Sequence, residues 1–380
     1  MKVLYAASTG SHITLFHLPY IRWLCRRGDE VHVMAPTCPV GLPEAAVFEE
    51  LPLEKKLSSP KNFRCAMALA KRLHGSGYDV VCLNTSLASF FIRFALMLAG
   101  GRQGMYVVNI SHGYLFGREM PLLRRTLLGA AEKLVACVTD RVVVMNARDL
   151  RLAQRRALCR GDVVPIDGMG VDFRRFERTS AERRAAARDE FGFADEAVVM
   201  VCAAEFSQRK NQQFLIRALA GLPREVKLLL PGQGELFERC KSEAESLGVA
   251  DRVVFPGQMR DVERALAAAD IYVTASMSEG LPFSVMEAMH TGLPVVASAV
   301  AGHTDLLRGG GGYLYRPGDT GAFTDAVIRL LDARRRRRLG VRAAEIGEKY
   351  SIESVFRRNV DAMGFLHAKQ IKKSKRRNSR

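Results

Sequence analysis

The stretch IYVTASMSEGLPFSVMEAMHTGLPVVAS, residues 271–298, decides the fold of the second half of the chain. It opens with an apolar run at residues 271–275, turns through Gly280 and Pro282, takes up a helical pattern from Ser284, and ends in a second apolar run at residues 294–298. Short continuous apolar runs are typical of strands that are covered on both faces of a parallel sheet. The order strand, helix, strand therefore predicts a βαβ unit.

The same alternation continues on both sides of this stretch. Further strands are predicted at residues 2–6, 30–34, 78–83, 105–110, 141–145, 197–203, 227–230 and 252–255. The pattern breaks near residues 168–172, and a charged stretch follows. The alternation predicts an α/β protein with two Rossmann-like, doubly wound domains. The predicted divisions are a first domain at 1–172, a linker at 173–192, a second domain at 193–350, a terminal helix at 351–366 and a basic, disordered tail at 367–380.

Composition narrows the class of protein. The chain has 380 residues, of which 48% are hydrophobic and 26% charged, so it is long enough for two globular cores. Its eight cysteines form no C-x-x-C pair, and none is near a histidine at metal-ligand spacing, which favours free thiols in a reducing cytosol. No signal peptide opens the chain and no apolar stretch is long enough to span a bilayer. We therefore expect a cytoplasmic protein.

The net charge of +17 favours an anionic partner, and it is concentrated in an arginine run at residues 334–338 and in the tail. No aromatic residues interleave the arginines and the tail carries no recognition element, so charge alone supports nucleic-acid binding, and we expect no nucleic-acid partner. A solvated helix face and a loose end explain the two clusters about equally well. An anionic membrane surface is the expected partner, through a face that includes Tyr20, Trp23 and Arg22 with Arg26 and Arg27.

The turn and helix start at residues 278–289 carry the strongest chemical signal. A helix start leaves backbone amides available and its dipole favours anions, so a diphosphate could dock at the amides of about Phe283 and Ser284. Glu287 could then accept hydrogen bonds from a ribose diol, and Glu279 could bond sugar hydroxyls. The alternative is a capping box, with Ser284 as the cap and Glu287 as its partner. The residues alone leave these two interpretations evenly balanced.

The sequence S-E-G-L-P-F-S-V-M-E-A-M, with glutamates at 279 and 287, resembles the signature of glycosyltransferase family 4. The following T-G-L-P-V-V-A-S stretch, Gly302 and Asp305 are similar to the donor-binding half of that family. Gly10-Ser11-His12, Phe16-His17, Pro19-Tyr20 and Ser111-His112-Gly113 resemble its bacterial exopolysaccharide and capsule branch. The resemblance extends to about Gly364.

This resemblance implies the GT-B fold, in which two Rossmann-like domains face a cleft and a C-terminal helix crosses back to the first domain. It also implies sugar transfer with retention of configuration and no metal or other cofactor, and the sequence contains no D-x-D between a strand and a loop. The donor-binding residues that it implies are Arg209, Lys210, Gly280, Leu281, Pro282, Phe283, Ser284 and Glu287. Lys210 would contact the donor diphosphate, although a surface lysine is the alternative. The chain departs from the family at Glu205, near which many members carry an arginine, so either Arg209 substitutes or Lys210 and amides act alone.

In the first half, the resemblance implies that His112 lines the reaction centre, and we count it with Glu279 and Lys210 as catalytic candidates. Gly10, Ser11 and His12 follow the first strand and are acceptor-side candidates, and helix packing is the alternative for His12 and for the neighbouring His17. The predicted function is transfer of a sugar from a nucleotide-sugar, with UDP favoured over GDP, to a glycan or polyprenyl-diphosphate-linked acceptor in cell-surface polysaccharide synthesis. The alternatives are a nucleotide-sugar epimerase on the same fold and a basic nucleic-acid-binding protein.

Overall fold

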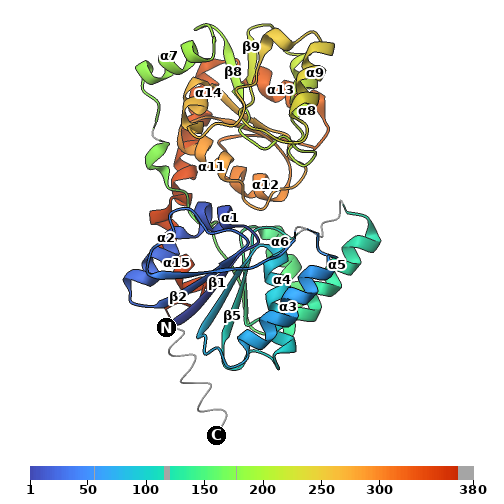
Figure 1. The fold of residues 1–380 in the computed structure, drawn as a ribbon. Coiled ribbons are helices and arrows are strands. Elements are labelled where there is room, and N and C mark those ends of the chain that lie inside the picture. Colours follow the sequence, from blue (N-terminus) through green and yellow to red (C-terminus); the bar gives the residue numbers. More distant parts are fainter. Residues whose placement is uncertain (55, 115–119, 177, 367–380) are drawn as a thin grey trace. The chain divides into compact units, whose positions relative to one another are not determined.

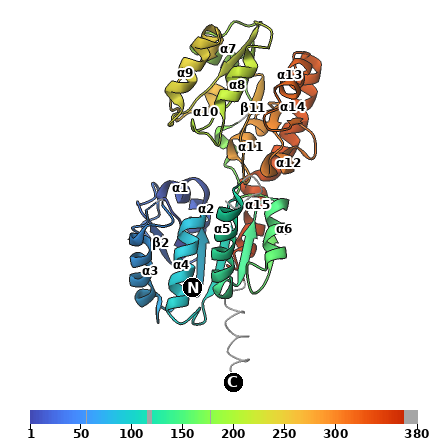
Figure 2. The ribbon, with the colours of Figure 1, turned by 90° about the vertical axis from the view of Figure 1, so that its right-hand side faces the viewer.

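The computed structural model describes residues 1–54, 56–114, 120–176 and 178–366. The described chain divides into two compact units, one formed by residues 1–170 with 355–366 and the other by residues 171–354 (Figures 1 and 2). Each unit is a parallel sheet with helices around it, so the predicted α/β class is confirmed. The tail predicted at 367–380 lies outside the described residues. No helix within them is both long and apolar enough to cross a bilayer.

The first unit contains a seven-stranded sheet in the order β3-β2-β1-β4-β5-β6-β7. Its strands are β1 (Lys2–Ala6), β2 (Glu30–Ala35), β3 (Ala46–Glu50), β4 (Val80–Asn84), β5 (Tyr106–Ser111), β6 (Arg141–Val144) and β7 (Val163–Pro165). All neighbouring strands pair in parallel. The central strands β4 and β5 are buried along their whole length, as continuous apolar runs predict. The order reverses between β1 and β4.

Helices connect these strands, and one buried ion pair joins two of them. The helices are α1 (Gly10–Phe16), α2 (Leu18–Arg26), α3 (Pro60–Leu73), α4 (Ser86–Leu98), α5 (Leu122–Val135) and α6 (Ala147–Arg156). Arg93 on α4 is fully buried, and its Nη2 atom donates to Glu132 Oε2 on α5 at 2.8 Å. Its Nε atom also donates to the carbonyl of Ser89 at 3.0 Å. A buried pair with these bonds satisfied fixes how α4 and α5 pack.

The C-terminal helix α15 (Ile352–Ala362) returns to the first unit, as the fold class predicts. The Phe356 ring stacks on the Tyr20 ring with centroids 5.0 Å apart. The Asn359 side-chain amide donates to the Tyr20 hydroxyl at 2.8 Å, and that hydroxyl donates to the carbonyl of Met169 at 2.6 Å. Tyr20 is therefore buried, and the expectation that it faces a membrane is wrong.

The second unit contains a six-stranded sheet in the order β10-β9-β8-β11-β12-β13. Its strands are β8 (Val198–Val201), β9 (Val226–Leu229), β10 (Val253–Val254), β11 (Ile271–Thr274), β12 (Val295–Ser298) and β13 (Gly312–Tyr315). These strands also pair in parallel. The order reverses between β8 and β11, so this unit has the same doubly wound organisation as the first.

The helices of the second unit include the stretch that opened the sequence analysis. They are α7 (Ala181–Glu190), α8 (Gln212–Leu219), α9 (Phe237–Ser246), α10 (Val262–Ala268), α11 (Phe283–His290), α12 (Ala301–Leu307), α13 (Thr320–Arg329) and α14 (Ala333–Gly347). Helix α7 lies within the range expected to be a linker and packs on α10, with Arg188 bonded to Asp270 at 2.7 Å. The arginine run at 334–338 lies on α14 and is mostly solvated. Its clustering therefore needs no explanation beyond an exposed helix face.

The spacing of Phe16, Tyr20 and Leu24 predicts a helix at residues 16–25, which the structure shows as α2, and α1 precedes it as a helix that was not predicted. Helix α1 ends at Phe16 and α2 begins at Leu18, with His17 between them. Pro19 lies in the first turn of α2, where its missing amide donor costs nothing, whereas in the middle of a continuous helix it would break the hydrogen-bond ladder. This break turns the His17 side chain into the core, where it is fully buried.

Candidate active site

The candidate site of the second unit lies where its strand order reverses. Strands β8 and β11 are neighbours at this point, and ligands of doubly wound sheets bind beyond the carboxyl ends of the strands where the order reverses. The loop after β8 carries Arg209 and Lys210, and the loop after β11 carries Glu279. Glu279 therefore meets Lys210 and Arg209 at one edge of the sheet, although they precede it in the chain by 69 and 70 positions.

Glu279 is the centre of a charged cluster at this edge. Its Oε1 atom accepts hydrogen bonds from Lys210 Nζ at 2.6 Å and from Arg209 Nη1 at 3.1 Å. Arg209 Nη1 also donates to the carbonyl of Ser278 at 3.2 Å. Burial raises the pKa of the Glu279 carboxyl, but Lys210 and Arg209 outweigh that effect, and its pKa lies below the ordinary value. Glu279 is therefore a carboxylate that holds two cations side by side.

The position of Arg209 in this cluster is relevant to Glu205, near which many members of the family carry an arginine. Glu205 is exposed, and its backbone carbonyl accepts a hydrogen bond from the Gln212 side chain at 2.8 Å. Arg209 instead brings a guanidinium beside Lys210 at the carboxyl edge of the sheet. Of the two alternatives that the sequence leaves open, the geometry favours Arg209 as the second cation.

The helix that follows Glu279 starts without a side-chain cap. Pro282 is the cap residue of α11, with φ −78° and ψ 122°, and its side chain makes no capping hydrogen bond to the first turn. Ser284 lies inside the helix, so the capping box with Glu287 does not form. The helix dipole at this end favours an anion. Leu281 and Pro282 form the turn before this helix start.

The turn is fixed from its other side by Gly302 on α12. A Cβ atom at Gly302 would lie 2.5 Å from the carbonyl oxygen of Gly280, closer than side chains approach backbone atoms. The Gly302 amide also donates to the carbonyl of Glu279 at 3.3 Å. Only glycine permits this close approach, which positions both Glu279 and the start of α11.

Glu287 lies in the middle of the short helix α11, and its side chain is only partly exposed. Burial raises the pKa of its carboxyl to about 7, with Arg175 lowering it and Glu263 raising it to smaller extents. The two glutamates of the motif therefore differ, since Glu279 is an ion-paired carboxylate and Glu287 is a carboxyl close to its midpoint at neutral pH.

Sequence reasoning missed His303, which lies beside this cluster. It is fully buried, and its Nδ1 atom is 2.8 Å from the carbonyl of Ser298 at the end of β12. Burial lowers the pKa of its ring, against the raising effect of Glu279. Its position between Gly302 and Asp305, which carried part of the family resemblance, was the signal that could have identified it.

The first unit has a corresponding pocket at its own switch point. A cavity of about 400 Å³ is lined by residues that follow the carboxyl ends of β1, β3, β4 and β5, namely Ser8, Thr9, His12, Leu53, Thr85, Ser86, Leu87, His112 and Gly113. His12 Nε2 and His112 Nε2 are 3.1 Å apart, so the pocket joins an acceptor-side candidate to a catalytic candidate. Behind them His17 completes a group of three histidines.

The other two acceptor-side candidates take different positions. Gly10 is buried at the start of α1, and a Cβ atom there would lie 2.3 Å from the carbonyl oxygen of Thr37. The side chain of Ser11 is exposed and bonds Thr9 Oγ1 at 3.3 Å. Neither residue lines the pocket, and the close approach of the Thr37 backbone, in the loop after β2, accounts for the glycine at position 10.

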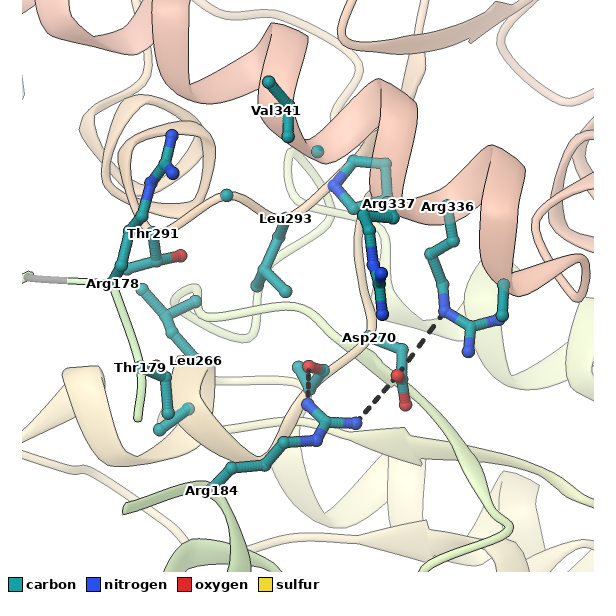
Figure 3. Close-up of a pocket in the computed structure, with 16 residues that line it drawn as sticks. Arg178, Thr179, Arg184, Leu266, Asp270, Thr291, Leu293, Arg336, Arg337 and Val341 are labelled. Carbon is teal, nitrogen blue, oxygen red and sulfur yellow. Dashed lines mark hydrogen bonds and ion pairs between the residues drawn. The ribbon is translucent and has the colours of Figure 1, made fainter. Parts of the chain in front are cut away.

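A larger cavity, of about 590 Å³, lies away from all of these residues. Asp270 and Pro294, which line it, precede β11 and β12, so it is at the amino ends of the strands, whereas ligands of doubly wound sheets bind at the carboxyl ends. Asp270 forms ion pairs with Arg184, at 2.8 Å, and with Arg336, at 3.5 Å (Figure 3). We assign the chemistry to the carboxyl edges and not to this cavity.

Comparisons with known proteins give the family. A model described as glycosyl transferase 4-like domain matches residues 17–167, and one described as glycosyl transferases group 1 matches residues 183–346. The chain is 30% identical over 333 residues to the putative glycosyltransferase EpsD of Bacillus subtilis, covering 87% of each chain. It is 23% identical over 286 residues to the Escherichia coli UDP-Gal:alpha-D-GlcNAc-diphosphoundecaprenol alpha-1,3-galactosyltransferase, covering 73% of each.

Solved structures agree on the fold. HepE of Anabaena, crystallised with UDP, superposes with a TM-score of 0.76 at 19% identity over 96% of this chain and 100% of its own. WaaG, a glycosyltransferase involved in lipopolysaccharide biosynthesis, gives a TM-score of 0.74 at 16% identity over 96% of this chain and 99% of its own. With two doubly wound units, a returning helix and a relative that matches along most of both chains, this protein belongs to glycosyltransferase family 4 and is a glycosyltransferase of the GT-B fold.

Proposed function

We propose that this enzyme transfers a sugar, with retention of configuration, from a UDP-sugar to a glycan or polyprenyl-diphosphate-linked acceptor in cell-surface polysaccharide synthesis. The observation that carries the donor half is the cluster of Glu279 with Lys210 and Arg209 beside the uncapped start of α11. The names of the relatives support the substrates, since the Escherichia coli enzyme uses UDP-Gal and a diphosphoundecaprenol-linked acceptor and HepE was crystallised with UDP.

Each residue of the cluster has a part in this proposal. Lys210 and Arg209 neutralise the diphosphate as the glycosidic bond to it breaks, together with the amide dipoles at the start of α11. Glu279 accepts hydrogen bonds from sugar hydroxyls and also holds the two cations in place before the donor arrives. Glu287, in its ionised form, accepts hydrogen bonds from the two ribose hydroxyls.

The proposed reaction needs no metal ion, because two side-chain cations and a helix start supply the positive charge at the leaving diphosphate. We expect the rate of transfer not to depend on added Mg²⁺ or Mn²⁺, the ions that would otherwise neutralise a leaving diphosphate. In the first unit, the pocket lined by His12 and His112 is the proposed acceptor site.

Calorimetry against a panel of nucleotide-sugars tests the donor assignment. The wild-type protein should bind a UDP-sugar, and Glu287→Ala should lose at least about tenfold in affinity, because two charge-assisted hydrogen bonds disappear. Glu345→Ala is a matched control, since its carboxylate is exposed on α14 and pairs with Arg342 at 2.8 Å. Equal affinity in the wild type and Glu287→Ala contradicts the ribose assignment. Conversion of the donor without any acceptor would identify an epimerase instead.

An anionic membrane surface is the second partner that we propose, and helix α5 is the face that meets it. Leu123, Leu127 and Leu134 follow one another at helical spacing, and their exposed fractions are 74%, 62% and 51%. Leu122, 68% exposed, and the solvated Arg124 adjoin this stripe. An apolar stripe beside basic side chains is the pattern of helices that lie in a membrane interface, and a chain with net charge +17 is attracted to anionic lipid.

Flotation with vesicles of anionic phospholipid tests this face. The wild-type protein should float with the vesicles at low salt, and Leu123→Glu should reduce the bound fraction severalfold, because it places a negative charge in the apolar stripe. Ile328→Glu is the control, since that side chain is 47% exposed on α13 of the other unit. Equal flotation of both variants contradicts the assignment of α5.

A further inference from the structure

We propose that His12, His17 and His112 form a binding site for Zn²⁺ in the first unit. Each ring offers one nitrogen, and the three nitrogens lie within 4.8 Å of one another. The site goes beyond the proposed sugar transfer, which uses no metal, and it is built wholly from residues of the first unit.

The spacing of the ring nitrogens is close to what a tetrahedral zinc ion requires. Zn–N bonds of about 2.0–2.1 Å place neighbouring ligand atoms roughly 3.4 Å apart. His12 Nε2 and His112 Nε2 are already 3.1 Å apart. Their rings meet almost at right angles, with an interplanar angle of 83°, so the two are not stacked. The third nitrogen lies within 4.8 Å of the other two, so reaching a spacing of roughly 3.4 Å needs a shift of at most about 1.4 Å (4.8 − 3.4), which the partly exposed His12 and His112 side chains can supply.

His17 supplies the independent observation that points to a ligand. The residue is fully buried, and its Nε2 atom has no hydrogen-bond partner among the described residues. Its Nδ1 atom is 2.9 Å from the Tyr5 hydroxyl, which also bonds the sulfur of Met363 at 3.5 Å. A buried nitrogen without a partner costs free energy, and a metal ion would satisfy it. The Tyr5 contact is the kind of second bond that orients a metal-binding imidazole and leaves the lone pair on its other nitrogen.

The chemistry of the three ligands selects the ion. Neutral imidazoles suit Zn²⁺, whereas Mg²⁺ and Ca²⁺ prefer oxygen ligands. Entry is open, because His12 and His112 line the cavity of about 400 Å³. Three protein ligands leave the fourth position of the ion facing that cavity.

Metal binding to the full-length chain tests the proposal. The protein is prepared without an oligohistidine tag, stripped with a chelator, and titrated with Zn²⁺ against a chromophoric zinc indicator. We expect one high-affinity Zn²⁺ per chain, a loss of at least about 100-fold in affinity for His17→Ala, and about tenfold for Tyr5→Phe, which removes only the orienting bond. His74→Ala is the control, since His74 is exposed and bonds the Ala99 carbonyl, and its affinity should equal that of the wild type.

Cobalt substitution separates this site from the eight cysteines of the chain. Co²⁺ bound to the three histidines should give the ligand-field absorption of a tetrahedral nitrogen and oxygen site without a thiolate charge-transfer band. A wild type that binds no stoichiometric metal, a His17→Ala variant with unchanged affinity, or a thiolate band would each overturn the proposal. If His17→Ala does not fold by circular dichroism, His112→Ala, whose ring is partly exposed, serves in its place. UDP-sugar affinity measured on the stripped protein reports on the proposed function separately.

Discussion

Replacing Glu287 by glutamine should change the pH dependence of both stability and donor binding. In the folded protein the pKa of this carboxyl is about 7, against an ordinary value of 4.5. The folded state therefore holds the proton more tightly than the unfolded state does. The resulting stabilisation is fully present below the unfolded pKa and is lost as the pH rises through the folded pKa. A difference of roughly 2.5 units corresponds to about 3 kcal/mol.

Glu287→Gln carries no titrating proton, so it escapes this loss. Its free energy of unfolding, minus that of the wild type, should rise by up to about 3 kcal/mol between about pH 5 and about pH 8. Urea unfolding of both proteins over this range measures the difference, in which other titrating groups cancel. Glu345→Gln, an exposed carboxylate on α14, provides the matched control and should give no such rise.

Donor binding should move in the opposite direction. Only the ionised Glu287 carboxylate can accept hydrogen bonds from both ribose hydroxyls. The fraction of protein with Glu287 ionised grows about tenfold between about pH 6 and about pH 8, so the apparent Kd of the wild type for a UDP-sugar should fall by the same factor. The diphosphate of a nucleotide-sugar does not titrate in this range, so the change reports on the protein. Glu287→Gln should bind weakly at every pH. A stability difference that stays flat with pH, or a wild-type Kd that does not fall, would refute the reasoning.

Three further variants test neighbouring claims. Glu279→Gln removes the carboxylate that holds Lys210 and Arg209 in place, so UDP affinity should fall severalfold in calorimetry and kcat by about 10²–10³-fold in a transfer assay, and an unchanged UDP affinity would argue against the cation-holding role. Lys210→Ala should weaken UDP binding in calorimetry by at least about tenfold, whereas a surface lysine would leave it unchanged. Arg93→Met should lower the free energy of unfolding by about 3–5 kcal/mol in urea, because Glu132 is left buried and unpaired, and Arg93→Met with Glu132→Leu should recover most of that loss.

Much of the fold was predictable because parallel strands buried on both faces read as short apolar runs. Strands β4 and β5 are of this kind, and both were predicted to within a residue or two of their bounds. Strand β3 was missed because it lies at the edge of its sheet, where only one neighbour pairs with it and its side chains stay partly exposed. Helix α7 was missed because most of its residues are charged, and the few alanines that pack on α10 give no clear apolar pattern in the sequence.

The proposed donor site could largely be predicted from the sequence, because its defining residues are close together in the chain. Glu279 and Glu287 flank one turn and one helix start, so local sequence alone predicts how they are arranged. The ion pair of Glu279 with Arg209 could not be predicted from the sequence, because it depends on β8 and β11 being neighbours in the sheet. The raised pKa of Glu287 was also hidden, since burial depends on the packing of the whole unit.

The acceptor half was harder to predict for the same physical reason, and His17 illustrates it best. The pattern Phe16, Tyr20 and Leu24 fits one helix, on which His17 would be one more packed residue. The helix break before Pro19 places the His17 side chain in the core. Strand β5 ends at Ser111, so His112 follows it and reaches the same place. No spacing in the sequence relates these histidines, because their proximity follows from the sheet order β1-β4-β5. A site assembled by topology becomes visible only once the strand order is known, and that is why the metal site proposed here could not be inferred from the sequence, whereas the donor motif could.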